Sequence, residues 1–152
     1  MWSYYLIYPL AWVLGRLPYK IQFLFSDAVR WVLYRVVRYR LGVVRQNLLA
    51  SFPEKSPQER RRIERAFYTH LADVFIETLS LASVSERQIR ERLRYLNAED
   101  LERWTAGRSW ISAMAHYGSW EYTTNFDLYR THDETLAVYR PLSNRGADRF
   151  YR

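Results

Sequence analysis

The stretch SWISAMAHYGSWEY, residues 109–122, decides the fold that the sequence predicts. Its first half, SWISAMA (109–115), is an apolar run of strand length, and LAVYR (136–140) is a second such run. A helical stretch over about 120–130 separates them. Strand, helix and strand in that order are typical of a βαβ unit with a parallel sheet, so the sequence predicts an α/β fold.

The second half, HYGSWEY, places His116 at the carboxyl end of the first predicted strand, where open α/β sheets hold their sites. On one continuous helix, His116 and Glu121 would point in different directions. If Glu121 instead lies in the first turn of a helix that follows, Gly118 permits a tight turn that folds the imidazole back onto the carboxylate, with Ser119 as a cap. One ring nitrogen would donate to Glu121 and the other would accept a substrate proton. From spacing alone, a purely structural histidine is the alternative.

Composition excludes several kinds of site. The chain has no cysteine, which excludes disulfides, a thiolate nucleophile and cysteine-bound zinc, and its three histidines are scattered, which argues against a metal site. Residues 1–62 carry 11 of the 23 basic residues but only 3 of the 16 acidic ones, whereas residues 63–152 carry 12 and 13. Because the positive part is also the most apolar part, the pattern favours an anionic membrane surface over nucleic acid.

The N-terminal region reads as a membrane-associated helical arm over residues 1–45. Residues 1–15 are uncharged and rich in tyrosine and tryptophan, but the run is shorter than the roughly 20 residues that cross a bilayer. An arm that lies on or dips into the membrane, a tilted or hairpin-like spanning arrangement, and two core helices of a soluble bundle are the alternatives. The next segment groups its apolar side chains near one helical face: Ile21, Phe25, Ala28, Val32 and Val36.

Amphipathic helices are expected between the arm and the strand. SPQE (56–59) combines a capping serine, a proline at the first helical position and a glutamate at the third, so a long helix should run from there to about residue 82. Its opening RRR (60–62) is a solvated face or a phosphate-facing patch. Two shorter helices follow: one that Ser85 and Gln88 open, and one that Asn97 caps and Gly107 stops.

HYGSWE is similar to the H-x4-D/E motif of the glycerolipid acyltransferase superfamily, and the chain resembles the bacterial lipid A late acyltransferases, the lauroyl and myristoyl transferases of lipopolysaccharide synthesis. In that family the histidine resembles a general base that deprotonates a hydroxyl of a sugar lipid, and the carboxylate orients the histidine. The hydroxyl then attacks the thioester of an acyl carrier protein. Carried over, His116 is the base and Glu121 its partner. The resemblance covers most of the chain: the aromatic N-terminal segment, VVRQNLLASFPEKS (43–56), RAFYTHLADVFIETL (65–79), the run into HYGSWE, and VYRPLSN (138–144).

The resemblance also implies substrate contacts and a location. A backbone amide near Gly118 is a candidate oxyanion donor, and Arg140 is a candidate for holding a phosphate of an anionic lipid A precursor, with Asn144 and Arg145 extending that wall. A surface arginine is the alternative for Arg140. No cofactor and no metal are implied, and the expected location is the cytoplasmic face of the bacterial inner membrane.

The expected organisation is the arm, residues 1–45, followed by the N-terminal portion of an acyltransferase domain, residues 46–152. Proteins of the resembling family continue beyond the point where this chain stops, so this piece alone is not expected to be a competent enzyme. Two alternative functions stay open. One is an acyltransferase of the same superfamily that acts on another glycolipid or an aminolipid, and the other is a non-catalytic membrane adaptor.

Overall fold

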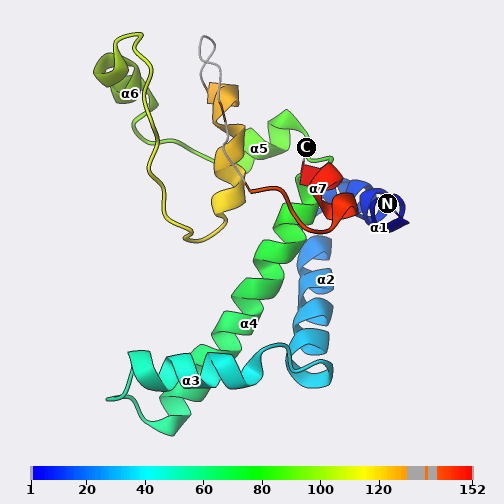
Figure 1. Cartoon of the computed structure of the whole chain (residues 1–152). Helices are drawn as coiled ribbons and strands as arrows, with labels where there is room; N and C mark the ends of the chain where they lie inside the picture. The colour runs from blue at the N-terminus through cyan, green and yellow to red at the C-terminus, as the bar shows by residue number, and fades with distance from the viewer. Residues whose placement is uncertain (1, 130–135, 137–139, 152) are drawn as a thin grey trace. The chain divides into compact units, whose positions relative to one another are not determined.

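A computed structural model describes residues 2–129, 136 and 140–151, and its regular elements are all helices (Figure 1). The chain divides into two compact units, Leu17–Ser80 and Met1–Arg16 with Leu81–Arg152. The predicted boundary at residue 45 stays a prediction. The elements are α1 (Trp2–Arg16), α2 (Tyr19–Trp31), the π-helix η1 (Val32–Val36), α3 (Leu41–Ser51), α4 (Pro57–Ser80), α5 (Glu86–Arg92), α6 (Ala98–Thr105), the 3₁₀ helix η2 (Trp120–Tyr129) and α7 (Arg145–Tyr151).

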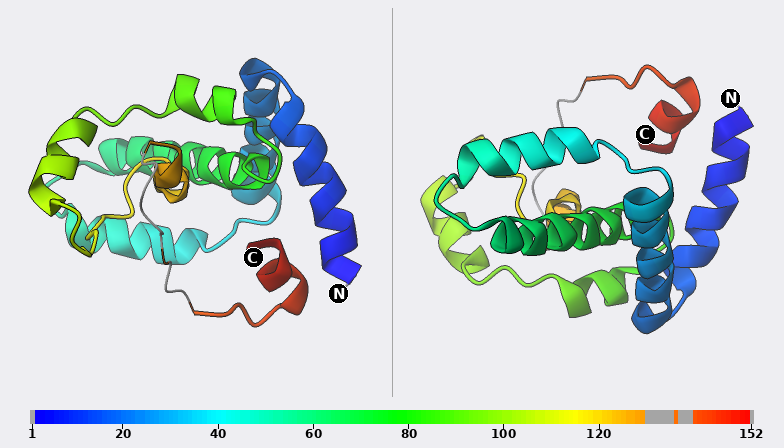
Figure 2. Two further views of the ribbon diagram at one scale, coloured as in Figure 1. Left: turned by 90° about the horizontal axis from the view of Figure 1, so that it is seen from above. Right: turned by 90° about the horizontal axis from the view of Figure 1, so that it is seen from below.

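The unit Leu17–Ser80 is built around α4, which carries α2 against its C-terminal half and α3 against its N-terminal half (Figure 1 and Figure 2). The contact between α2 and α4 is polar. The Tyr19 hydroxyl donates to Glu77 Oε1 at 2.7 Å, and the Ser26 hydroxyl donates to Asp73. The buried side of α4 repeats about once per turn, as expected for a helix packed along one face: Glu64, Tyr68, Ala72, Ile76 and Ser80.

The apolar side chains of α2 and η1 face outward. Gln22 and Ser26 are the buried residues of α2, whereas Leu24 is 68% exposed. This arrangement is the reverse of a helix that packs an apolar stripe into a core. The set that the sequence groups on one face lies exposed throughout: Ile21, Phe25, Ala28, Val32 and Val36.

Local capping signals place the helix starts where the sequence predicts them. Ser56 N donates to Glu59 Oε2 at 2.8 Å and Glu59 N donates to Ser56 Oγ at 3.3 Å, which is a capping box that opens α4. The same reciprocal pair, Ser85 with Gln88, opens α5. The predicted long helix therefore begins where expected, and it ends at Ser80, close to the predicted residue 82.

The turn between η1 and α3 is held by a long-range hydrogen bond. Arg38 and Arg40 both have a positive φ, of 53° and 51°, which is an unfavourable conformation for residues with a Cβ. Between them, the Tyr39 carbonyl accepts a hydrogen bond from the Tyr68 hydroxyl of α4. The bond from α4 therefore fixes the strained turn.

The second unit contains two helix pairs. The α1 helix packs on α7, where the Arg149 guanidinium lies 4.6 Å from the centre of the Tyr4 ring. The α5 helix packs on η2, where Arg92 Nη1 donates to the Tyr122 hydroxyl at 2.9 Å. The predicted helix after Asn97 is α6, and two residues with positive φ, Ala106 and Gly107, follow its end.

The predicted α/β fold is wrong: the described residues contain no strand, and therefore no βαβ sheet. Residues 109–115 form an extended segment that belongs to no strand or helix, and Ile111 is 95% exposed. Of the second predicted strand, Leu136 and Arg140 are described and neither is in a strand, while residues 137–139 lie outside the described residues. The physical reason is that an extended segment becomes a strand only when a neighbour pairs with its backbone groups. The predicted helix between them is present as η2.

The helices predicted for a membrane arm are short. In the described part of the chain, no helix combines the length and the apolar composition that a membrane crossing needs. The α1 helix has 15 residues and α2 has 13, below the roughly 20 that span a bilayer.

Candidate active site

His116 lies at the end of the extended segment, immediately before a tight turn into η2. Tyr117 N donates to the Ala115 carbonyl at 2.9 Å, and Gly118 has a φ of +61°. A Cβ on Gly118 would meet no atom within 4 Å, so the left-handed backbone, and not crowding, favours glycine here. Tyr122 N then donates to the Ser119 carbonyl at 3.1 Å, which begins the helix.

This turn places His116 and Glu121 relative to the helix as the sequence predicts. His116 precedes the helix, and Glu121 is the acidic residue of its first turn. The imidazole is exposed and lies against the Trp120 ring, with centroids 4.3 Å apart and planes tilted by 60°. The predicted hydrogen bond between His116 and Glu121 is not formed in the described structure; the two side chains interact electrostatically instead.

The carboxyl of Glu121 is partly buried, and burial raises its pKa, while the nearby charge of His116 acts in the opposite direction and lowers it. His116 and Glu121 therefore lie close enough for the charge of His116 to act on the Glu121 carboxyl. In catalytic pairs such a hydrogen bond is often long or poorly aligned until substrate binds.

Contacts that the sequence does not reveal hold η2 in place. Tyr122, next to Glu121, is buried and accepts a hydrogen bond from Arg92 of α5. Arg90 of the same helix donates to the Leu128 carbonyl. These residues position Glu121 through its helix. Tyr122 lies inside the quoted motif, but nothing in the spacing of Arg90 or Arg92 marks them as its partners.

The other predicted site residues, Arg140, Asn144 and Arg145, lie at or near the start of α7. Asn144 Oδ1 accepts from the backbone N–H groups of Gly146 and Ala147 at 2.9 and 3.2 Å, so its side chain caps α7. Arg140 is exposed, and within the described residues no hydrogen bond or ion pair joins it to His116 or Glu121. Arg145 is the first residue of α7 and is exposed. A role of these residues in substrate binding stays a prediction.

The remaining histidines lie elsewhere. His70 is exposed on α4, and His132 lies outside the described residues. Among the residues that the structure describes, no cluster of three or more His, Asp or Glu side chains is arranged to hold a metal ion.

Replacing Glu121 with glutamine is expected to make the protein more stable at neutral pH. Because burial raises the folded-state pKa of Glu121, the charged carboxylate is disfavoured in the fold. The cost of burying the charge is fully present above the folded-state pKa of Glu121 and disappears below its unfolded-state pKa. The stability gained by Glu121→Gln should therefore shrink as the pH falls from the folded-state to the unfolded-state pKa. Urea unfolding of both proteins at a series of pH values measures the difference in their free energies of unfolding.

Glu54→Gln is the control, because Glu54 is exposed in the loop before α4. It should leave the free energy of unfolding nearly unchanged at every pH. A gain from Glu121→Gln that is the same at acidic and neutral pH would contradict a buried charge at Glu121.

Comparison with known proteins gives one family. A family model described as bacterial lipid A biosynthesis acyltransferase matches residues 1–151. No curated protein and no solved structure matches the chain.

Proposed function

We propose, since the chain belongs to the bacterial lipid A biosynthesis acyltransferase family, that it transfers a fatty acyl group from an acyl carrier protein thioester to a hydroxyl of a lipid A precursor. The family consists of acyltransferases of lipid A biosynthesis, and the match extends over nearly the whole chain. The observation that carries the finer proposal is the pair His116 and Glu121. The imidazole of His116 is exposed, and its charge acts on the carboxyl of Glu121.

In the proposed reaction, His116 removes the proton of the acceptor hydroxyl. The oxygen attacks the thioester carbonyl carbon, and the C–S bond breaks in the tetrahedral intermediate, giving an ester. The leaving thiolate takes the proton from the imidazolium. Glu121, on which the charge of His116 acts, is the proposed partner that orients the imidazole while it carries the proton. The exposed turn at Gly118 is the proposed place for a backbone N–H that stabilises the oxyanion.

The proposed place of action is the cytoplasmic face of the bacterial inner membrane. The outward apolar side chains of α2 and η1 support contact with lipid, because a soluble surface rarely exposes a contiguous apolar stripe. The positive charge of residues 1–62 supports attraction to anionic headgroups and to the acidic acyl carrier protein. Arg140 is proposed to contact a phosphate of the acceptor, and Asn144, which caps α7, to lie nearby.

The test is transfer of a labelled acyl group from acyl carrier protein to a tetra-acylated lipid A precursor by membranes that contain the full-length gene product. Membranes without the gene product are the control. We expect labelled precursor only in the first sample. Transfer to a different glycolipid or to an aminolipid would replace the acceptor in this proposal, and no transfer to any lipid would favour the non-catalytic adaptor.

A further inference from the structure

A basic cleft lies in the unit Leu17–Ser80, separate in sequence from the His116 motif. It has a volume of about 270 Å³ and opens between α3 and the first turns of α4. Three arginines and one glutamate line it, which leaves two positive charges uncompensated. The lining residues are Arg45, Leu48, Pro57, Arg60, Arg61 and Glu64.

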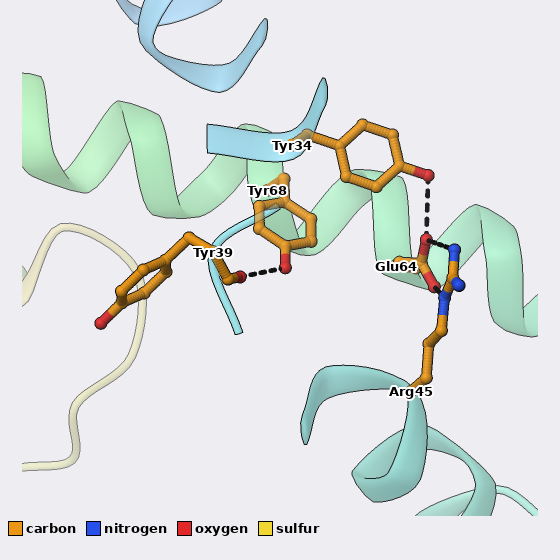
Figure 3. A network of polar contacts seen from close by, with 5 residues as sticks. All are labelled: Tyr34, Tyr39, Arg45, Glu64 and Tyr68. Atoms are coloured by element: carbon orange, nitrogen blue, oxygen red, sulfur yellow. Dashed lines mark hydrogen bonds and ion pairs between the residues drawn. The ribbon is translucent and has the colours of Figure 1, made fainter. Parts of the chain in front are cut away.

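The glutamate of the cleft is fully engaged by its neighbours. Glu64 is only 2% exposed, and Figure 3 shows its carboxylate between Tyr34 and Arg45. Oε1 accepts from the Tyr34 hydroxyl at 2.9 Å and from Arg45 Nη2 at 3.2 Å, and Oε2 accepts from Arg45 Nε at 2.8 Å. These bonds lower the pKa of Glu64, so it is ionised at neutral pH. Its charge is therefore used to fix Arg45, whose other amino group stays available at the cleft wall.

The other two arginines differ in how they are held. Arg60 Nη1 donates to the carbonyls of Phe52 and Pro53 at 3.2 and 3.5 Å, and also to that of Lys55, so the loop before α4 positions it. Arg61 makes no hydrogen bond or ion pair with any described residue, although its charge acts on Glu64. The cleft thus combines two positioned guanidinium groups, of Arg45 and Arg60, with that of Arg61, whose N–H donors bind no described residue.

We propose that this cleft binds a phosphate group in its dianionic form. Guanidinium groups present paired N–H donors that match phosphate oxygens, and two uncompensated charges match a phosphate that carries a charge of about −1.5 to −2 near neutral pH. The phosphate belongs either to a lipid headgroup or to a soluble molecule. The proposal does not depend on acyl transfer, because neither His116 nor Glu121 lines the cleft.

Arg61 and Arg62 provide a matched pair of variants. They are neighbours on α4 with the same side chain, but Arg61 lines the cleft and Arg62 does not; Arg62 acts on the exposed Glu59 instead. Titration of the protein with inorganic phosphate in a phosphate-free buffer, followed by NMR or calorimetry, measures the dissociation constant. Arg61→Gln should raise it on the order of tenfold, whereas Arg62→Gln should leave it nearly unchanged.

Two results would overturn the proposal: no binding of phosphate by the wild-type protein, or equal weakening by both variants, which would indicate only general surface charge. Far-UV circular dichroism and a melting curve show whether each variant is folded. Arg61 and Arg62 are exposed, and Arg61 makes no hydrogen bond or ion pair with a described residue, so both variants should melt like the wild type.

Vesicles of phosphatidylcholine with and without phosphatidic acid identify the source of the phosphate. If Arg61→Gln weakens both the binding of inorganic phosphate and the additional vesicle binding that phosphatidic acid produces, the cleft holds a lipid headgroup. If it loses inorganic phosphate but keeps the vesicle binding, the cleft holds a soluble phosphate. Either result supports the site.

Discussion

Replacement of His116 with alanine is expected to reduce acyl transfer by about 10²- to 10⁴-fold, the usual contribution of a positioned general base. The acceptor hydroxyl is a poor nucleophile until a base takes its proton, and the imidazole of His116 is the proposed base. Its exposure before η2 leaves it accessible to a substrate, and its charge acts on the carboxyl of Glu121. The loss should appear in kcat more than in KM, because the proton moves only in the transition state. Initial rates with labelled acyl carrier protein measure both.

His70→Ala is the matched control, since His70 is also exposed but lies on α4 outside the motif. It should transfer acyl groups at the wild-type rate. Because His116 contacts the Trp120 ring, tryptophan fluorescence and circular dichroism must show that His116→Ala is folded. A folded His116→Ala protein with undiminished transfer would make HYGSWEY a structural turn and would remove the proposed mechanism.

The helix starts of this chain follow from short local signals. The capping boxes at Ser56 and Ser85 each involve two side chains three residues apart, so the sequence contains the whole interaction. The left-handed turn at Gly118 is equally local. As the sequence predicts, His116 precedes this turn, and Glu121 lies in the first turn of the helix that follows. Predictions that need only neighbouring residues are therefore the ones that the structure confirms.

The sheet failed as a prediction because a strand depends on partners distant in sequence. SWISAMA is apolar enough for a buried strand, but in the structure the same residues are exposed and form no strand, because a strand requires a neighbouring strand to complete its ladder. The site shows the same limit. The capping role of Asn144 and the support of Tyr122 by Arg92 arise from folding, and residue spacing does not encode them.

Replacement of Tyr68 with alanine is expected to lower the free energy of unfolding by about 3 to 5 kcal/mol, as for other large side chains removed from a core. Tyr68 is 0% exposed, and its ring lies 5.0 Å from that of Tyr34 (Figure 3). Its hydroxyl holds the Tyr39 carbonyl in the turn with two positive-φ arginines. The substitution therefore leaves a cavity beside α4 and also releases a strained turn. Urea unfolding followed by circular dichroism measures the loss.

Two variants separate these contributions. Tyr68→Phe keeps the ring and removes only the bond to Tyr39, so it should lose about 1 kcal/mol. Phe67→Ala removes a ring from the neighbouring position, but Phe67 is 41% exposed, so its loss should also stay near 1 kcal/mol. Equal losses for Phe67→Ala and Tyr68→Ala would contradict a core centred on Tyr68. A loss for Tyr68→Phe as large as for Tyr68→Ala would instead assign the stability to the hydrogen bond that pins the turn, and the ring would then contribute little.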